Sequence, residues 1–97
     1  MMAKTEPFDP ARYLVRPEAQ EDLLNDALAS GDAGYVAQAL GVIARARGMS
    51  EVAREAGVTR EALYRALSED GDPRLTTLLG VARALGVTLT AHVDPVG

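Results

Sequence analysis

The 97 residues suit a single domain that buries roughly 60–65% of its unfolded surface, and ten basic against fourteen acidic residues give a net charge of −4. The absence of cysteine excludes disulfides and thiolate metal sites, and a single histidine argues against a zinc site made from protein ligands alone. No segment has the apolar core of a signal peptide or the roughly 18 apolar residues of a membrane span, so we expect a cytoplasmic protein.

The first 17 residues are predicted to form an extended N-terminal arm. Residues 1–17 contain three of the five prolines, which disfavour a helix here. Phe8, Tyr13 and Leu14 are the residues that could hold this arm against the body of the domain.

Two helices are predicted after the arm. The first covers about residues 18–30 and ends at Gly31. The second covers about residues 33–47 and begins after Asp32, a residue suited to capping a helix N-terminus. Apolar side chains at helical spacing define the inner faces of both: Leu23, Leu24, Ala27 and Leu28 in the first, and Val36, Ala39, Leu40 and Ile43 in the second.

Residues 49–68 have the pattern of a helix-turn-helix. Ser50 is expected to cap the first helix, and Gly57 can adopt the left-handed backbone conformation that ends it. Thr59 is expected to cap the second helix, and Leu63 to anchor that helix in the core. These features in register predict two short helices joined by a tight turn.

The second helix of this motif has two chemically different faces. At about 100° per residue, small apolar side chains fall on one side and long polar ones on the other. The inner side holds Ala62, Leu63, Ala66 and Leu67, and the outer side holds Arg60, Glu61, Tyr64, Arg65 and Ser68. This division is typical of a recognition helix that enters the major groove of DNA, and the alternative is an ordinary helical hairpin without a ligand.

Charge is distributed unevenly along the chain. Residues 1–34 hold three basic and seven acidic residues and therefore carry the whole net charge of −4. Residues 45–65 hold five Arg and three Glu, a local charge of +2, and Arg suits bidentate contacts to phosphate and guanine. So little net positive charge predicts weak DNA binding by a monomer, which points to a dimer or to a partner that adds basic surface.

After the motif, the sequence predicts a fifth helix and a short strand. A polar turn at residues 69–73 precedes a helix at about 75–86, which Gly86 ends. Residues 87–93 alternate between apolar and polar, which is the period of a β-strand. Because a lone strand has unpaired edges, this one should pair with its own copy in a homodimer, with residues 13–15 or with another protein, unless it frays in solution.

Four stretches between about residues 8 and 89 carry a family resemblance: FDPARYL, ALGVIARARGMS, AREAGVTREALYRALS and GDPRLTTLLGVARALGV. Through them the chain resembles the bacterial addiction-module antidote proteins, HigA-like antitoxins of the lambda-repressor-type helix-turn-helix superfamily. The resemblance implies an all-α fold in which residues 1–97 form one five-helix, lambda-repressor-like DNA-binding domain, here with a short C-terminal β-strand. It also implies a type II antitoxin that neutralises a RelE/ParE-like toxin and represses its own operon. Asp72 stands where the family would have Asn, and no functional change is expected because both residues suit turns.

Carried onto this sequence, the resemblance assigns DNA contacts to the motif and its flanks. The residues expected to face base edges are Arg60, Glu61, Tyr64 and Arg65, and those expected on the DNA backbone are Arg45, Arg47 and Arg54. Ser50 and Thr59 are caps first and could also hold phosphates. Arg65 could equally clamp a phosphate, Glu61 could instead pair with Arg65, and Tyr64 could pack against the following loop.

No nucleophile, phosphate-binding or metal pattern is present, so we expect neither an enzyme nor a cofactor, and His92 is interpreted as a surface residue. Two other functions stay open: a stand-alone repressor without a toxin, and a protein-binding module that has lost DNA binding. The acidic N-terminal part suits a basic toxin, so the toxin contact is expected there. The homodimer is expected to form through the last helix and residues 87–93.

Overall fold

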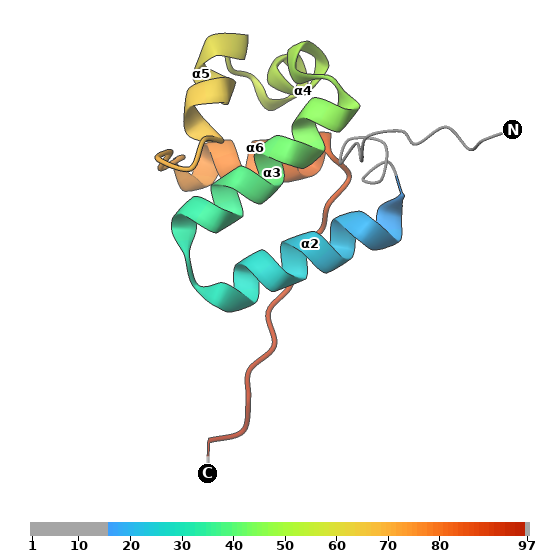
Figure 1. Ribbon diagram of the computed structural model, residues 1–97, viewed down its shortest axis with the longest axis vertical. Coiled ribbons are helices and arrows are strands. Elements are labelled where there is room, and N and C mark those ends of the chain that lie inside the picture. Colours follow the sequence, from blue (N-terminus) through green and yellow to red (C-terminus); the bar gives the residue numbers. More distant parts are fainter. Residues whose placement is uncertain (1–15, 97) are drawn as a thin grey trace, which may run out of the picture.

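A computed structural model describes residues 16–96, and this part of the chain folds into five α-helices without a β-strand. The helices are α2 (Pro17–Ser30), α3 (Ala33–Arg47), α4 (Met49–Ala56), α5 (Arg60–Ala66) and α6 (Leu75–Ala84). Figure 1 shows α2 and α3 as a hairpin, with α4 and α5 on the opposite side of α3 from α2. The predicted all-α class is confirmed for these residues. The arm residues Phe8, Tyr13 and Leu14 lie outside the described part of the chain.

Local chemistry explains the turn between α2 and α3. Gly31 has a left-handed backbone with φ 71°, which ends α2. An Asp32 carboxylate oxygen accepts hydrogen bonds from the backbone N–H groups of Gly34 at 2.9 Å and Tyr35 at 3.3 Å, so it caps α3 as predicted. The Tyr35 hydroxyl donates to the Asp26 carboxylate at 2.5 Å, and this hydrogen bond raises the pKa of Tyr35. The two helices are thus linked by side chains as well as by the turn.

Helix α4 begins two residues earlier than a cap at Ser50 would place it. The N-cap of α4 is Gly48, whose carbonyl accepts a hydrogen bond from the Val52 N–H at 3.0 Å. Gly48 has a φ of 124°, which lets α3 pass into α4 without a linker. Ser50 therefore lies inside the first turn, where no side chain caps the helix, and its predicted role as the N-cap is wrong.

The turn between α4 and α5 follows the prediction. Gly57 is left-handed at φ 78° and ends α4. The Val58 N–H donates to the Ala53 carbonyl at 3.0 Å, which closes the end of the helix. The Thr59 hydroxyl oxygen accepts from the Ala62 N–H at 3.0 Å and caps α5. These bonds fix the angle at which α5 leaves α4.

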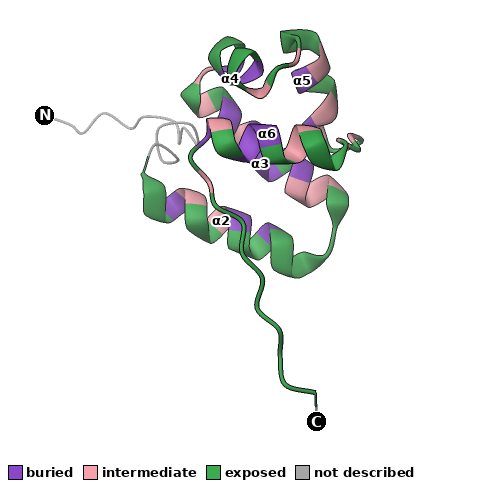
Figure 2. Ribbon diagram, turned by 180° about the vertical axis from the view of Figure 1, so that it is seen from behind, coloured by how far each residue is buried: buried purple, intermediate pink, exposed green. Residues whose placement is uncertain are grey.

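The core lies where the inner faces of the helices meet, as the buried surfaces in Figure 2 show. Its largest fully buried side chains come from α3 through α6: Ile43, Val52, Leu63, Leu67 and Val81. Leu24 and Ala27 add the buried face of α2. Full burial of each large aliphatic side chain contributes roughly 1.5–3 kcal/mol, so this core both stabilises the domain and orients α5.

The C-terminal segment differs from the prediction. After α6, the Val87 N–H donates to the Ala82 carbonyl at 2.8 Å, and the chain then crosses α2 toward solvent (Figure 2). Residues 88–96 are exposed, and residues 87–93 form no strand within the described chain. An alternating pattern gives a segment two faces, but a strand also needs a neighbouring backbone for its hydrogen bonds. The predicted strand therefore does not form within the single described chain.

Candidate nucleic-acid interface

The side of α5 that points away from the core is polar. Leu63, which is 0% exposed, holds this seven-residue helix against the core. The exposed side chains are four of those predicted for the outer side: Arg60, Glu61, Tyr64 and Arg65. Ser68 differs, because it is half-buried and its hydroxyl donates to the Arg65 carbonyl at 3.0 Å. The outer face of α5 is therefore formed by one aromatic and three charged side chains.

Tyr64 is the centre of a cluster that joins α5 to α3. The guanidinium carbon of Arg60 lies 5.3 Å from the centroid of the Tyr64 ring, and that of Arg45 lies 5.6 Å from it. Both distances are within the range of cation–π attraction. A guanidinium nitrogen of Arg60 also donates to the Tyr64 hydroxyl at 3.4 Å. The ring thus contacts two arginines.

The exposed arginines around α5 have no acidic partners. Within residues 16–96, no carboxylate lies at ion-pair distance from Arg45, Arg54, Arg60 or Arg65, since the ion pairs found there lie near the two ends of this range. Glu61 consequently does not pair with Arg65, and its place in the first turn of α5 lets it stabilise the positive end of the helix dipole. The arginine charges are therefore available to an anionic partner.

Arg47, the last residue of α3, has a different environment from the exposed arginines around α5. One of its guanidinium nitrogens donates to the Ala84 carbonyl at 3.1 Å, and the other donates to the Leu85 carbonyl at 3.2 Å. These carbonyls belong to the C-terminal end of α6, which is left without intrahelical donors. Arg47 thus ties α3 to α6, a role that the sequence reasoning missed because no local pattern relates residues so far apart.

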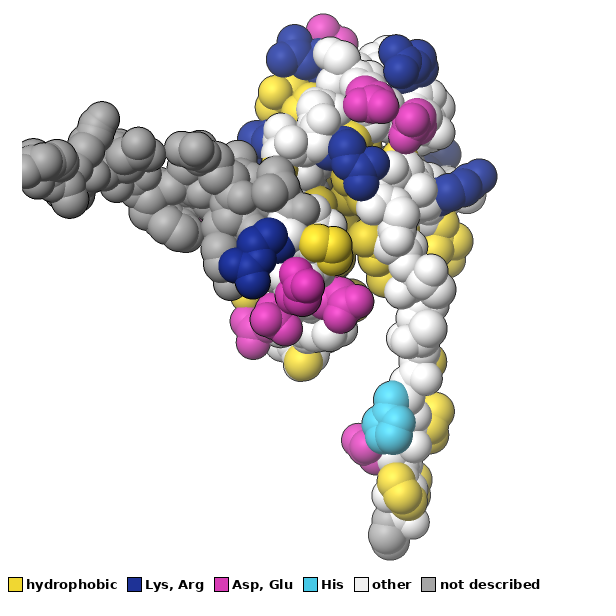
Figure 3. All heavy atoms as spheres, turned by 90° about the vertical axis from the view of Figure 1, so that its right-hand side faces the viewer, with side chains coloured by type: hydrophobic (Ala, Val, Ile, Leu, Met, Phe, Trp, Pro, Cys, Tyr) yellow, Lys and Arg dark blue, Asp and Glu magenta, His cyan; other side chains and the backbone are white. Residues whose placement is uncertain are grey.

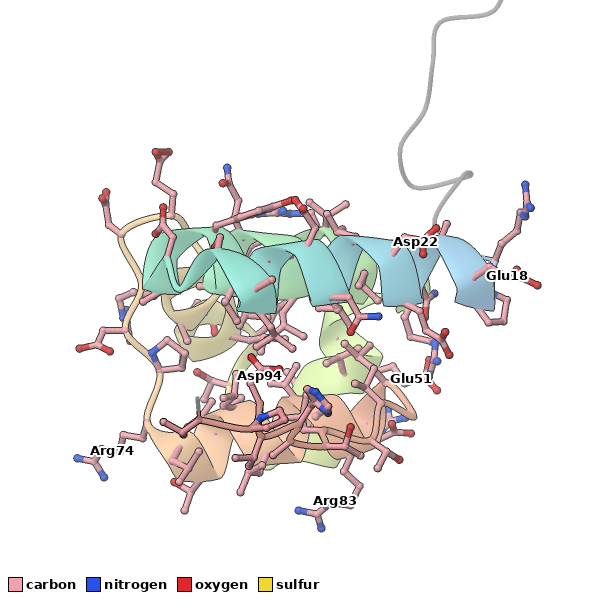
Figure 4. All side chains as sticks on the ribbon, turned by 90° about the horizontal axis from the view of Figure 1, so that it is seen from below. Glu18, Asp22, Glu51, Arg74, Arg83 and Asp94 are labelled. Carbon is pink, nitrogen blue, oxygen red and sulfur yellow. The ribbon has the colours of Figure 1, made fainter. Side chains whose placement is uncertain are left out.

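A separate acidic surface lies on α2. We define the α2 acidic surface by the exposed carboxylates of that helix: Glu18, Glu21, Asp22 and Asp26. Figure 3 shows acidic side chains gathered over this helix, whereas most arginines lie over other elements. Figure 4 shows Glu18 and Asp22 on α2, with Arg74 and Arg83 across the molecule beside α6. The uneven charge along the sequence therefore becomes an uneven charge across the surface.

Two further properties concern only the described part of the chain. None of its helices combines the length and the apolar composition needed to cross a membrane. Its His, Asp and Glu side chains do not gather in groups of three or more that could hold a metal ion.

Comparison with known proteins assigns the chain to a family. Residues 4–93 match the model of a family described as "Probable addiction module antidote protein". The chain belongs to this family. It is also 41% identical over 87 residues to an uncharacterized protein of Haemophilus influenzae, an alignment that covers 90% of each chain. No solved structure matches the chain significantly.

Membership of the antidote family confirms the coarser part of the functional prediction. An antidote of an addiction module acts on a cognate toxin, so the family implies a toxin partner and an antitoxin role. Antidote proteins are generally not enzymes, in agreement with the expectation from the sequence. The HigA-like and lambda-repressor-like assignments remain predictions, as do the type of toxin and the binding of DNA.

Proposed function

We propose that this antidote protein neutralises a RelE/ParE-like toxin and represses its own operon by binding DNA through α4 and α5. The proposed DNA binding rests on one observation, the outer face of α5. Arg60 and Arg65 are exposed there without acidic partners among the described residues. A buried Leu63 and the Thr59 cap hold this face in a fixed orientation. Rigid presentation of a polar helix face is what recognition in the major groove requires.

The roles proposed for individual residues follow from their positions. Arg60 lies in the first turn of α5, the part of a recognition helix that reaches base edges. Its guanidinium can donate two hydrogen bonds to one guanine. Arg65 and Arg54, in the last turns of α5 and α4, are proposed to bind phosphates. Ser50 is exposed in the first turn of α4 and is proposed to reach a phosphate. Arg47 is left out because its guanidinium already binds two carbonyls.

A homodimer through α6 and residues 87–93 completes the proposal for DNA binding. Leu75 is 67% exposed and Leu79 is 46% exposed, and both lie on the outer side of α6. Residues 88–93 have no backbone hydrogen-bond partner among the described residues, and the same segment of a second copy would supply partners in an antiparallel pair. Two copies also double the number of arginines that face DNA, which compensates for the low net positive charge of one chain.

The α2 acidic surface is the proposed contact for the toxin. Its four carboxylates are exposed, and α2 lies on the opposite side of α3 from α5 (Figure 1), so toxin and DNA could bind the same molecule. A toxin with a basic surface would be attracted to it electrostatically. Exchanging Glu21 and Asp22 for Lys should weaken capture of the toxin encoded beside the gene and leave DNA binding unchanged. Unchanged capture by this variant would contradict the proposed toxin surface.

Substitutions of single arginines test the proposed DNA binding. Arg60→Ala should reduce selectivity for the DNA upstream of the gene, because a lost bidentate contact to a base costs roughly 1–3 kcal/mol. Arg65→Ala should weaken binding to all duplexes alike. Arg16→Ala is the matched control, since it removes one positive charge at the N-cap of α2, a helix that lies on the opposite side of α3 from α5 (Figure 1). If both α5 variants bind the duplex like the control, the chain acts as a protein-binding module only.

A further inference from the structure

Two guanidinium groups from different helices converge on one exposed ring. Arg45 comes from α3, outside the helix-turn-helix, and Arg60 comes from the first turn of α5. Their guanidinium carbons lie 5.6 Å and 5.3 Å from the centroid of the Tyr64 ring. Like charges repel, so long exposed side chains would otherwise separate in water. The negative face of the aromatic ring supplies an attraction that draws both charges to the same place.

The cluster has no internal anion. No carboxylate within the described residues lies at ion-pair distance from either guanidinium, and residue Tyr64 is 37% exposed. The hydrogen bond from Arg60 to the Tyr64 hydroxyl orients one guanidinium but neutralises neither. The two positive charges therefore create a concentrated positive potential at the surface, which attracts a polyanion such as DNA.

We propose that Tyr64 is a positioning residue that holds two arginines for DNA: it places the Arg45 guanidinium to bind a phosphate of the DNA backbone, and it places the Arg60 guanidinium to contact a base edge. This inference rests on the proposed DNA binding and extends it, because it makes α3 a third element of the interface. Tyr64 has few rotatable bonds, so it can hold two flexible side chains in place before DNA arrives. Side chains that are already ordered lose less conformational entropy when they bind.

A purely structural role for Tyr64 predicts different behaviour. The attachment of α5 to the rest of the domain depends mainly on Leu63 and Leu67, which are 0% and 1% exposed. Removing an exposed ring from a helix held in this way should leave the fold intact. A positioning role instead predicts that the affinity for DNA and its salt dependence change while the melting temperature stays nearly the same.

The experiment measures fluorescence anisotropy of a duplex from directly upstream of the gene, over a series of salt concentrations. Each exposed cation–π contact corresponds to roughly a two- to fivefold change in an equilibrium constant, so loss of both contacts in Tyr64→Leu should weaken binding by about four- to twenty-fivefold. Tyr64→Phe keeps the ring and should lose less than about threefold. Arg45→Ala should lower the salt slope by about 1. Arg16→Ala is again the control, and melting by circular dichroism verifies the fold of every variant.

The outcomes separate this inference from the proposed function. If the wild-type protein binds selectively and Tyr64→Leu binds with the same affinity and salt slope, the positioning role is wrong and the proposed function stands. If the wild-type protein binds no duplex selectively, both are wrong. In a double-mutant cycle, Tyr64→Leu should have a smaller effect on the background of Arg45→Ala, and strictly additive effects would also overturn the positioning role.

Discussion

Replacing Arg47 with Ala tests whether this arginine stabilises the fold instead of binding DNA. The Arg47 guanidinium donates to the Ala84 and Leu85 carbonyls at 3.1 and 3.2 Å. Hydrogen bonds that involve a charged group contribute roughly 1.5–3 kcal/mol each when shielded. Arg47 is an exposed residue and water competes for both carbonyls, so we expect the free energy of unfolding to fall by about 1–2 kcal/mol in total.

In a domain of this size, a loss of about 1–2 kcal/mol lowers the melting temperature by roughly 4–16 °C. Urea unfolding of Arg47→Ala and wild type measures the change directly. The matched variant is Arg54→Ala, which removes an exposed arginine of α4 that has no ion-pair partner within residues 16–96. We expect opposite results: Arg47→Ala loses stability and keeps the salt slope of DNA binding, whereas Arg54→Ala keeps stability and lowers the slope by about 1. Equal stability of both variants would refute the role assigned to Arg47.

Three further predictions concern the core, a close contact between helices and the hydrogen bond that links α2 to α3. Leu63→Ala should cost about 2–5 kcal/mol of unfolding free energy, while Leu75→Ala on the exposed side of α6 should cost less than about 0.5 kcal/mol, both by urea unfolding. Gly41→Ala should also destabilise the domain, because a Cβ there would lie 2.6 Å from a backbone carbonyl oxygen at the end of α5; unchanged stability would show that the helices can separate at low cost. The raised pKa of Tyr35 means that the folded state binds this proton more tightly, so the stabilisation is present below pH 10 and is lost as the pH rises through the folded pKa. Ultraviolet titration should show that Asp26→Ala returns this pKa toward its ordinary value, and an unchanged titration would contradict the link.

The parts of the fold that follow from sequence are those specified by neighbouring residues. In two turns a glycine ends one helix and a polar side chain caps the next: Gly31 with Asp32, and Gly57 with Thr59. Their hydrogen bonds span only a few residues, and both turns form as predicted. The inner face of α5 also follows from helical periodicity, since Leu63 is buried at the expected place. The start of α4 was missed because a glycine with φ 124° is not distinguishable from other glycines in the sequence.

The parts that do not follow from sequence depend on contacts between distant residues. Arg47 looks like the other arginines near the motif, and its carbonyl partners lie 37 and 38 residues further along the chain. The contact of Arg45 with Tyr64 likewise depends on how α3 packs beside α5. A strand at residues 87–93 would likewise need a neighbouring backbone, and the described residues place none beside this segment. Composition could therefore suggest a positive region, but only the packing shows which arginines are already engaged.

The most direct test of the proposed function is a salt titration of wild-type binding to the duplex upstream of the gene, beside a scrambled duplex. Three arginines per chain, Arg45, Arg54 and Arg65, give a dimer up to about six phosphate contacts. The logarithm of the binding constant should then fall with the logarithm of salt concentration with a slope of up to about −5. We expect tight and selective binding to the upstream duplex with a slope of this order. Equal, weak binding to both duplexes at low salt would contradict repression by this protein and leave only its antidote role.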